Sequence, residues 1–492
     1  MPTLHRAALA VALGAASLPL GAQLVTPRTV PVHQADQFDI LPSSRTGMAN
    51  VWIALDDTLL DPFANPAKAG RLRTGQLFVL PYVHSISGNR GGGRTVPLGA
   101  AFASGAWTGM GIVAIQQLDR VNTAWGVPNT ERTATNQYAT GVLSRRLANG
   151  VTIGGAISLA GLGAVDGVDL MYSGSDTIRQ DGSMSDLRLG LTKDWEGGRT
   201  WELVLVHNRM AMEHDVHTSL WLPGTPVAPQ GRVVTNWDHN ADKTNIWGIH
   251  SEYVRPFGTE GWRLGWLATA NRISHPKIPN FRLMNIPRDP GHTSSFNAGV
   301  GLARLVGPAS LGIDVIYEPM FSTTWADAAS DTTTLAGGTI RAGGRTVENH
   351  FRFTNSKLRL GMGFEHRRRR DSSVVMGFQA GLSLGSVNYR LKQRDFVRDT
   401  RRIQDENWME WVPTVGWHYK SRDLEFFYSL RIACISGQEC ANLGFLGSGD
   451  DVSIAAPAPA AGGGVIVAPS APLTFQAGRA VMHRLTFRVP IR

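Results

Sequence analysis

Few side chains in this sequence are spaced for catalysis or metal binding. Three histidines and one glutamate fall close together, namely His207, Glu213, His214 and His217. Their spacing across a predicted strand end and the following loop matches no recognised set of metal ligands. No Gly-x-Ser-x-Gly element serves as a nucleophile elbow. We therefore expect no catalytic residue, no metal site and no other cofactor, and a protein that is not an enzyme.

The two cysteines, Cys434 and Cys440, are separated by five residues. Two thiols without a nearby histidine do not make a zinc site. In an oxidising compartment we expect a disulfide that closes a small loop, with two free thiols as the alternative.

The composition excludes several classes of protein. Of 492 residues, 18% are charged, against roughly 25% in an average soluble domain. After residue 22, no apolar run reaches the roughly 18–20 residues that a membrane-spanning helix requires. The formal charge of +9 comes from dispersed basic residues, and the one dense run, at 366–370, is typical of a solvated turn. A β-rich protein that does not bind nucleic acid remains, either soluble or in a membrane.

Residues 1–22 have the features of a signal peptide. His5 and Arg6 precede an apolar stretch of 14 residues, Ala7–Leu20, which is too short to span a membrane as a helix. Gly21-Ala22 then offers small residues for cleavage. We expect the mature chain to leave the cytoplasm.

Long segments with period-two alternation fill the rest of the chain. Leu187, Leu189 and Leu191, for example, alternate with charged residues and glycine. Such alternation fits any half-buried antiparallel sheet. These segments are longer than the 5–6 residues of an average soluble strand, and membrane-barrel strands need about 9–11. Similar alternation occurs at 262–271, 311–318, 357–365 and 423–432.

The connections between these segments alternate between short and long. We predict long loops at, among others, 214–241, 389–406 and 436–478. A transmembrane barrel has this asymmetry, and a soluble sandwich has no reason for it. The count is sixteen strands, with fourteen as the alternative because two prolines interrupt the first hairpin. We predict an all-β fold, a transmembrane antiparallel β-barrel of about 14–16 strands formed by residues 75–492.

Charged residues on the polar face of the predicted strands would face the lumen. Opposite charges on neighbouring strands can pair, and so pack the interior or hold a plug. The alternative is that some of them line a permeation path, where they bind a carboxylate or set an ion preference. The candidates are Arg188, Asp194, Arg263, Asp314, Glu318, Arg359 and Arg431.

Residues 23–74 are polar and contain several prolines, unlike a barrel strand. Asp57, Asp61 and Asn65 fall four residues apart and would share one face of a helix, which Pro62 and Pro66 would keep short. They would either cap turns or anchor the segment against basic residues of the lumen. The whole segment either hangs in the periplasm or folds into the lumen as a plug.

The element Asn65-Pro66-Ala67, after Asp57 and Asp61 and before a first strand with proline, resembles the FadL family of long-chain fatty acid transporters. The resemblance covers residues 50–118, and beyond them only the architecture is similar. It implies an N-terminal hatch at 23–74 that plugs an outer-membrane barrel. The sixteen strands counted in this chain depart from the fourteen of the family. The same superfamily includes PorV-type components of a secretion system.

We therefore expect passive uptake of hydrophobic or amphipathic small molecules, such as fatty acids, across the outer membrane of a diderm bacterium. The alternative is a structural or interaction barrel for secreted proteins, with 436–478 as its docking surface. An open general porin is the third reading. The expected partners are outer-membrane lipid and a hydrophobic ligand, and a secreted protein under the alternative.

Overall fold

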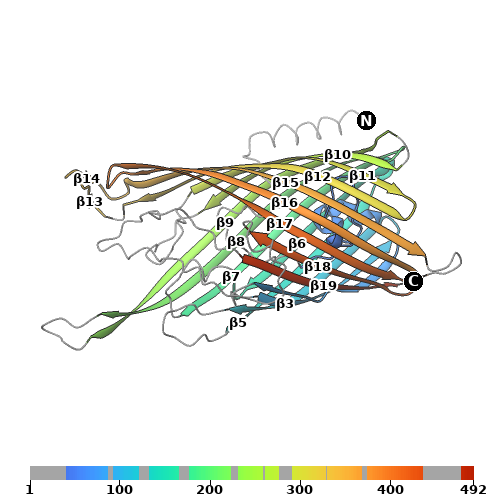
Figure 1. The fold of residues 1–492 in the computed structure, drawn as a ribbon, viewed down its shortest axis with the longest axis horizontal. Coiled ribbons are helices and arrows are strands. Elements are labelled where there is room, and N and C mark those ends of the chain that lie inside the picture. The colour runs from blue at the N-terminus through green and yellow to red at the C-terminus, as the bar shows by residue number, and fades with distance from the viewer. Residues whose placement is uncertain are drawn as a thin grey trace.

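The computed structural model shows one closed antiparallel β-barrel (Figure 1). Sixteen strands form its wall, as the long alternating segments predict, and the short turns lie at the end where β19 (Gly478–Ile491) finishes. Among the described residues, no helix is long and apolar enough to cross a membrane. The structure describes residues 40–86, 92–120, 132–165, 177–222, 231–258, 261–275, 291–328, 330–367, 374–435 and 478–491.

Each strand pairs with its neighbours in the sequence, and β19 closes the barrel against the first ones. The first strands are β1 (Gly75–Val79), β2 (Tyr82–Ile86), β3 (Gly92–Ser104), β4 (Trp107–Arg120), β5 (Arg132–Arg146), β6 (Val151–Leu162), β7 (Thr177–Trp195) and β8 (Arg199–Leu222). The next are β9 (Arg232–Pro256), β10 (Trp262–His275), β11 (Gly291–Val306), β12 (Ala309–Asp327), β15 (Arg345–Arg367), β16 (Val375–Asp395), β17 (Thr400–Lys420) and β18 (Glu425–Ile435). A separate small hairpin joins β13 (Thr332–Thr333) and β14 (Thr339–Ile340).

The strands β1 and β2 are two halves of one interrupted strand. Both pair with β3 on one side and β19 on the other. Leu80 and Pro81 separate them, because proline has no N–H to give to the ladder. The Leu80 N–H instead donates to the Pro97 carbonyl at 3.0 Å, and the Pro81 carbonyl accepts from Leu485 at 2.9 Å. The interruption therefore leaves the barrel closed.

Two of the long loops predicted from the sequence are largely strand, and those predictions were wrong. The β8–β9 ladder continues to the pair Leu222↔Arg232, so most of 214–241 is paired. Likewise β16 and β17 pair as far as Asp395↔Thr400, within the predicted loop 389–406. In the β8–β9 ladder, polar residues such as Asp215 and His239 interrupt the apolar alternation while backbone pairing continues. The predicted loop 436–478 lies almost entirely outside the described residues.

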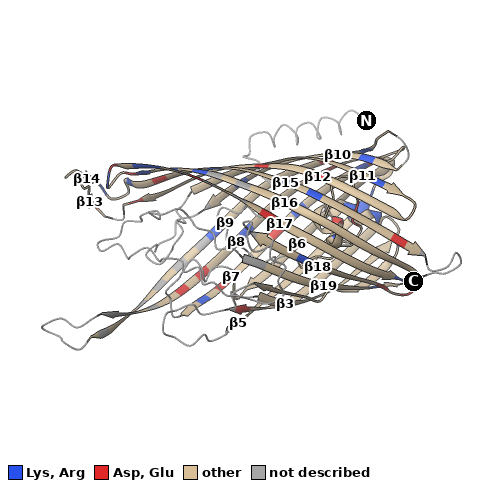
Figure 2. Cartoon of the chain, in the orientation of Figure 1, with Lys and Arg blue, Asp and Glu red and all other residues tan. Residues whose placement is uncertain are grey.

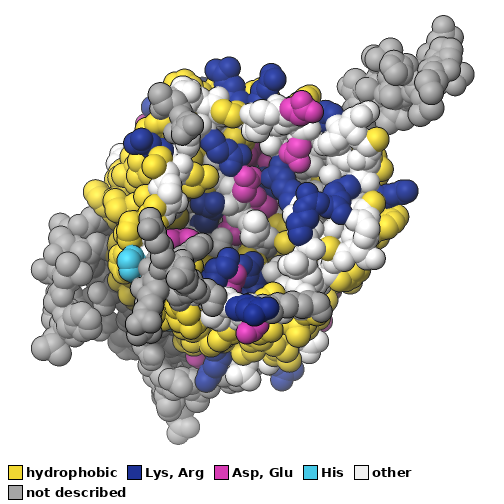
Figure 3. Space-filling model, turned by 90° about the vertical axis from the view of Figure 1, so that its right-hand side faces the viewer, with side chains coloured by type: hydrophobic (Ala, Val, Ile, Leu, Met, Phe, Trp, Pro, Cys, Tyr) yellow, Lys and Arg dark blue, Asp and Glu magenta, His cyan; other side chains and the backbone are white. Residues whose placement is uncertain are grey.

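The outer face of the barrel is apolar. Large hydrophobic side chains such as Val113, Leu189 and Val315 are more than half exposed there. An end-on view shows hydrophobic side chains around the outside and charged ones within the ring (Figure 3). An outward apolar band of this kind is the membrane-facing surface of a transmembrane barrel.

Aromatic and basic residues mark the outer face near the short turns. Trp107, Trp195 and Trp262 each begin or end a strand there. Arg145, Lys193 and Arg304 respectively lie over these rings, with the cationic atom 5.1–5.9 Å from the ring centroid. Paired aromatic and basic side chains are typical of a membrane–water interface.

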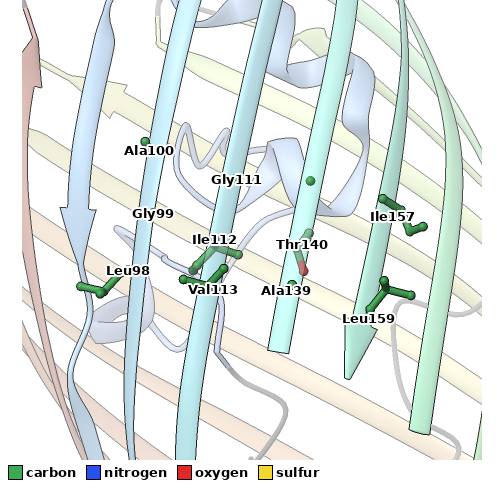
Figure 4. A pocket seen from close by; sticks show the side chains of 11 residues that line it. Leu98, Gly99, Ala100, Gly111, Ile112, Val113, Ala139, Thr140, Ile157 and Leu159 are labelled. Atoms are coloured by element: carbon green, nitrogen blue, oxygen red, sulfur yellow. The ribbon is translucent and has the colours of Figure 1, made fainter. Parts of the chain in front are cut away.

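A shallow apolar groove of about 590 Å³ crosses β3–β6 (Figure 4). Leu98, Val113, Ile157 and Leu159 line it, and all four are exposed on the outer face. Its floor includes small residues, among them Gly141, where an added Cβ would meet nothing within 4 Å. The groove therefore opens towards the surrounding membrane and not towards the lumen.

Residues 40–72, called here the inner segment, lie inside the barrel (Figures 1 and 4). Their helical turns are η2 (Thr46–Met48), α2 (Asp61–Ala64) and η3 (Pro66–Arg71). Pro62 lies in the first turn of α2, and the Asn65 side chain accepts a hydrogen bond from the Ala67 N–H at the start of η3. Proline fits only the first turn of a helix, so the two prolines keep these helices short, as the sequence predicts.

Candidate functional site

The inner segment lies directly on glycines of the barrel wall. A Cβ added at Gly154 would lie 2.5 Å from the Pro66 carbonyl carbon, and one at Gly301 would lie 2.5 Å from the Ile53 Cβ. Any side chain at these positions would displace the inner segment. This close approach accounts for glycine on the polar face of so many strands. The same closeness holds at Gly190, Gly265, Gly312, Gly361 and Gly381.

The first half of the inner segment, residues 40–55, contacts the wall mainly through apolar groups. Ile53 is fully buried against Leu267 of β10 and Ile316 of β12. Two backbone hydrogen bonds fix its position: Ala49 N–H donates to Thr414 Oγ1 at 2.9 Å, and Trp52 N–H to Asp314 Oδ2 at 2.9 Å. A second apolar group contains Met48, Val51, Ala54, Leu55 and Ala303.

The second half, residues 56–72, combines apolar packing with ion pairs to the wall. Asp56 accepts from Arg263 of β10 at 2.8 Å and from Arg71 at 2.9 Å. Arg71 also pairs with Asp194 of β7 at 2.9 Å. Arg188 donates to two backbone carbonyls of α2 at 3.2 and 3.3 Å. Figure 2 shows acidic and basic residues distributed along the strands of the wall.

Lys68 occupies the centre of a buried charged cluster. Its Nζ lies 2.9 Å from Glu202 Oε1 of β8 and 3.6 Å from Asp61 Oδ2. The Asn65 side-chain amide donates to the other Glu202 oxygen at 2.6 Å. Glu252 of β9 stands directly opposite Glu202 in the ladder, and both are buried. Because opposed like charges on neighbouring strands repel each other, Lys68 stabilises this part of the wall.

The pKa values of Asp61 and Lys68, both in the inner segment, are raised above their ordinary values. Burial raises the pKa of Asp61 to about 7, since the opposing effect of Lys68 is outweighed by burial and the nearby acids Asp57, Asp56 and Glu202. Burial alone would lower the pKa of Lys68, but Asp61 and Glu202 raise it above its usual value. Lys68 therefore stays charged, while Asp61 titrates near neutral pH.

The seven charged residues that the sequence places in the lumen do not all make the same kind of contact. Arg188, Asp194, Arg263 and Asp314 contact the inner segment as described, and Arg359 donates to its Asn50 carbonyl at 3.4 Å. Glu318 instead pairs with Lys357 of the neighbouring strand at 2.8 Å. Arg431 stands opposite Thr414 and Met482, both buried.

The three polar residues predicted within the hatch make local contacts, and Asn65 in addition donates to Glu202 of the wall. Asp57 accepts from the Ser43 hydroxyl at 2.7 Å and from the Ser44 backbone N–H at 3.0 Å. Asn65 begins η3, and Asp61 lies beside Lys68 of the same segment. Capping and turn formation thus describe Asp57 and Asn65. It is Asp56, not singled out from the sequence, that contacts the basic lumen residue Arg263.

A buried apolar cluster lines the barrel further from the short turns. The ladder places Ala114, Tyr138, Ala160, Met184 and Met210 directly opposite one another in a row across β4–β8. It extends to Leu162 and Ile178, at the long-connection ends of β6 and β7. We call this set the luminal apolar cluster: Ile40, Tyr82, Ala114, Tyr138, Ala160, Leu162, Val165, Ile178, Met212, Val216 and Met482, with Leu41, Met184 and Met210 packed against it.

Among the described residues, the three histidines and Glu213 do not form a group of metal ligands. His207 stacks on Trp247, with ring centroids 4.0 Å apart, His217 contacts Trp237, and His214 is buried. One Gly-x-Ser-x-Gly run does occur, at 381–385, but it lies inside β16 and not at a strand-to-helix turn. Cys434 is buried near the end of β18, and Cys440 lies outside the described residues.

Sequence reasoning missed Lys68 and Glu202, which form the buried ion pair between the inner segment and β8. Lys68 stands alone among small residues, in Pro66-Ala67-Lys68-Ala69-Gly70, which is an unusual place for a solvated lysine. Glu202 lies two residues before buried Val204 of β8 and therefore points to the same, inward face. Leu205, next to Val204, points outward and is exposed. Those two signals could have identified the pair.

Comparison with known proteins places this barrel among distant structural neighbours. No protein-family model matches the chain, and no curated protein is significantly similar to it. Similar solved structures include a Pseudomonas aeruginosa FadL homologue, with 12% identity, a TM-score of 0.40, and coverage of 92% of this chain and 98% of that one.

Two further structures are similar to a comparable degree. The Pseudomonas putida toluene transporter TodX has 9% identity and a TM-score of 0.37, over 90% and 96% of the two chains. The Escherichia coli K12 ferric-catecholate import receptor Fiu has 8% identity and a TM-score of 0.37, over 85% and 82%. At these TM-scores, only the geometry of this chain can support a function.

Proposed function

We propose that this protein is an outer-membrane barrel for the uptake of hydrophobic or amphipathic small molecules, and that residues 40–72 plug its lumen. The luminal apolar cluster carries the proposal. An open porin has a polar, water-filled interior. Here the inward residues of β4–β8 that face one another include Ala114, Tyr138, Ala160 and Met184. Binding of an apolar solute to such a wall is favourable, whereas transfer of an ion from water to it is unfavourable.

The chemistry of the cluster suits variable apolar solutes. Met184, Met210, Met212 and Met482 belong to it or pack against it. Methionine side chains are flexible and polarizable, so they can repack around ligands of different shape. Each square ångström of apolar surface that a ligand buries there contributes roughly 25 cal/mol. Ile40 and Leu41, the first residues of the inner segment, also belong to this wall, so a ligand in it would contact the plug.

Ligand binding tests the role of the cluster. Met184→Asn and Met212→Asn should each weaken binding of dodecanoate and of the fluorescent probe N-phenyl-1-naphthylamine about tenfold, because about 1.4 kcal/mol of apolar contact is lost. Thr324→Asn is the matched control, since Thr324 is also buried and inward on β12 but lies outside the cluster. Equal affinity of all four proteins would contradict uptake through this wall.

Planar-bilayer conductance tests the plug. We expect the full-length barrel to be nearly silent and a variant lacking residues 40–72 to conduct steadily, because the contacts across the lumen are then gone. The slower gel migration of unheated protein, which is typical of folded barrels, would show that the shortened chain still folds. A large steady conductance of the full-length protein would instead indicate an open porin.

A further inference from the structure

Three potential metal ligands meet on the wall beside the inner segment. Glu202 of β8 and both His250 and Glu252 of β9 each offer one ligand atom, and these atoms lie within 4.8 Å of one another. The three side chains are 2%, 2% and 4% exposed. Water therefore does not solvate the two carboxylates. Lys68 and Asn65 stabilise Glu202, whereas Glu252 Oε2 has no hydrogen-bond partner among the described residues.

The orientation of His250 leaves one ring nitrogen facing the carboxylates. Its Nδ1 lies 2.8 Å from Thr269 Oγ1, and its ring stacks on Trp52 of the inner segment, with centroids 5.8 Å apart. The hydroxyl and the indole hold the ring in one place, as outer partners do for metal-binding histidines. Its Nε2 then lies 4.0 Å from Glu252 Oε2.

That separation suits two ligands of one ion better than a hydrogen bond. A direct N–H···O bond would bring the atoms to about 2.7–3.2 Å. Ligand atoms at roughly 2.0–2.2 Å from a common ion are separated by about 3–4.4 Å. Among the described contacts, Glu252 Oε2 is a buried acceptor without a hydrogen-bond partner. A buried carboxylate oxygen left in this way points to a missing cationic partner.

The surrounding charges leave a deficit that a divalent cation would fill. Asp56 and Asp194 are matched by Arg71 and Arg263, and Asp186 by Arg188 at 2.6 Å. What remains is three carboxylates, Asp61, Glu202 and Glu252, against one cation, Lys68. With all groups ionised, their formal charges sum to two negative charges in a buried place, and with Asp61 protonated to one.

We propose that Glu202, His250 and Glu252 bind one divalent transition-metal ion, Zn²⁺ or Mn²⁺. One imidazole nitrogen with two carboxylates is a donor set that these ions accept, whereas Ca²⁺ prefers oxygen ligands alone. Lys68 and Asn65 do not block the site, because each carboxylate oxygen of Glu202 keeps a second lone pair. The ion joins β8 to β9 and stiffens the wall on which Asn65, Lys68 and Trp52 of the inner segment lie.

Metal analysis of the untagged, detergent-purified full-length protein tests the proposal. After exposure to Zn²⁺ or Mn²⁺ and gel filtration, elemental mass spectrometry should find about one ion per chain. His250→Gln and Glu252→Gln should lower the occupancy at least tenfold. His418→Gln should not, because His418 is also buried but lies 3.4 Å from a single carboxylate, Glu365.

A second measurement separates loss of metal from loss of fold. Gel migration of the unheated variants shows whether the barrel is closed, and the same ions should raise the unfolding temperature of the wild-type protein and of His418→Gln only. Sub-stoichiometric metal in the wild type, or equal occupancy in folded His250→Gln and Glu252→Gln, would overturn the site. Neither result would affect the proposal of ligand uptake, because that proposal depends on the luminal apolar cluster and not on the metal site.

Discussion

The two halves of the inner segment are held in different ways. Residues 40–55 contact the wall through buried apolar side chains and through glycines such as Gly301, where Ile53 fills the space of a missing side chain. Residues 56–72 add ion pairs, with Lys68 and Arg71 bonded to carboxylates of β8 and β7. Apolar contacts do not respond to pH or charge, whereas buried ion pairs do. A change of charge should therefore affect the attachment of the second half to the wall more than that of the first half.

Removing the central cation should have the largest effect. In Lys68→Met, Glu202, Glu252 and Asp61 would share a buried place without Lys68, and breaking a buried pair costs about 3–5 kcal/mol. We expect a lower midpoint of chemical unfolding, followed by tryptophan fluorescence, and faster proteolysis within residues 56–72. Arg94→Gln is the control, because its pair with Asp119 is largely exposed and should contribute little. Equal unfolding midpoints of Lys68→Met and the wild-type protein would contradict the claim that ion pairs hold residues 56–72.

Filling a glycine position should have the next largest effect. In Gly301→Val the new Cβ would meet the Ile53 Cβ at 2.5 Å, and overpacking of this kind costs about 1–3 kcal/mol. We expect the first half of the inner segment to leave the wall, which ion conductance and proteolysis around residue 53 would detect. Gly141→Val is matched to it, since nothing lies within 4 Å of its added Cβ. If both variants stay silent and protected, the glycine contacts do not hold the plug.

The same contrast explains what the sequence could predict. Alternation of apolar and polar residues identifies strands wherever one face meets lipid, so it predicts β7 and β12 and the count of sixteen. It fails where polar residues interrupt the apolar pattern, as near Asp215 and His239 at the ends of β8 and β9. Backbone pairing continues there although the alternation is irregular, so those strands appeared as loops.

The candidate site was predictable only in part. The polar face of each strand indicates which charges point inward, and Asp314 and Arg263 do contact the inner segment. Their partners depend on how residues far apart in the sequence meet, such as Asn65 and Glu202. Periodicity within one strand cannot supply that information. The sequence shows that glycines occur on the polar face of the strands. It does not show why: Gly154, for example, leaves room for Pro66, which only the fold brings close to it.

Titration of Asp61 should have the smallest effect on stability. It is also the change that best separates the two halves of the inner segment. Its pKa is raised from 3.8 to about 7, so between these values the folded protein binds a proton that the unfolded chain does not. Stability should therefore fall as pH rises from about 4 to about 7, and this contribution should be constant above that. Lys68 lies beside this carboxylate and the Asp57 N–H donates to it, and the pKa of about 7 already includes the opposing effect of Lys68.

Asp61→Asn removes this titration and keeps the shape of the side chain. Near pH 5 the variant should unfold at almost the wild-type temperature, because both side chains are neutral there. At pH 8 it should be the more stable of the two by a few degrees, and proteolysis within residues 56–72 should be slower than in the wild type. Residues 40–55 should show no such difference, because apolar contacts and glycines such as Gly301 hold them. If the temperature gap between variant and wild type is the same at both pH values, burial does not keep Asp61 protonated, and the charged half is as insensitive to pH as the apolar half.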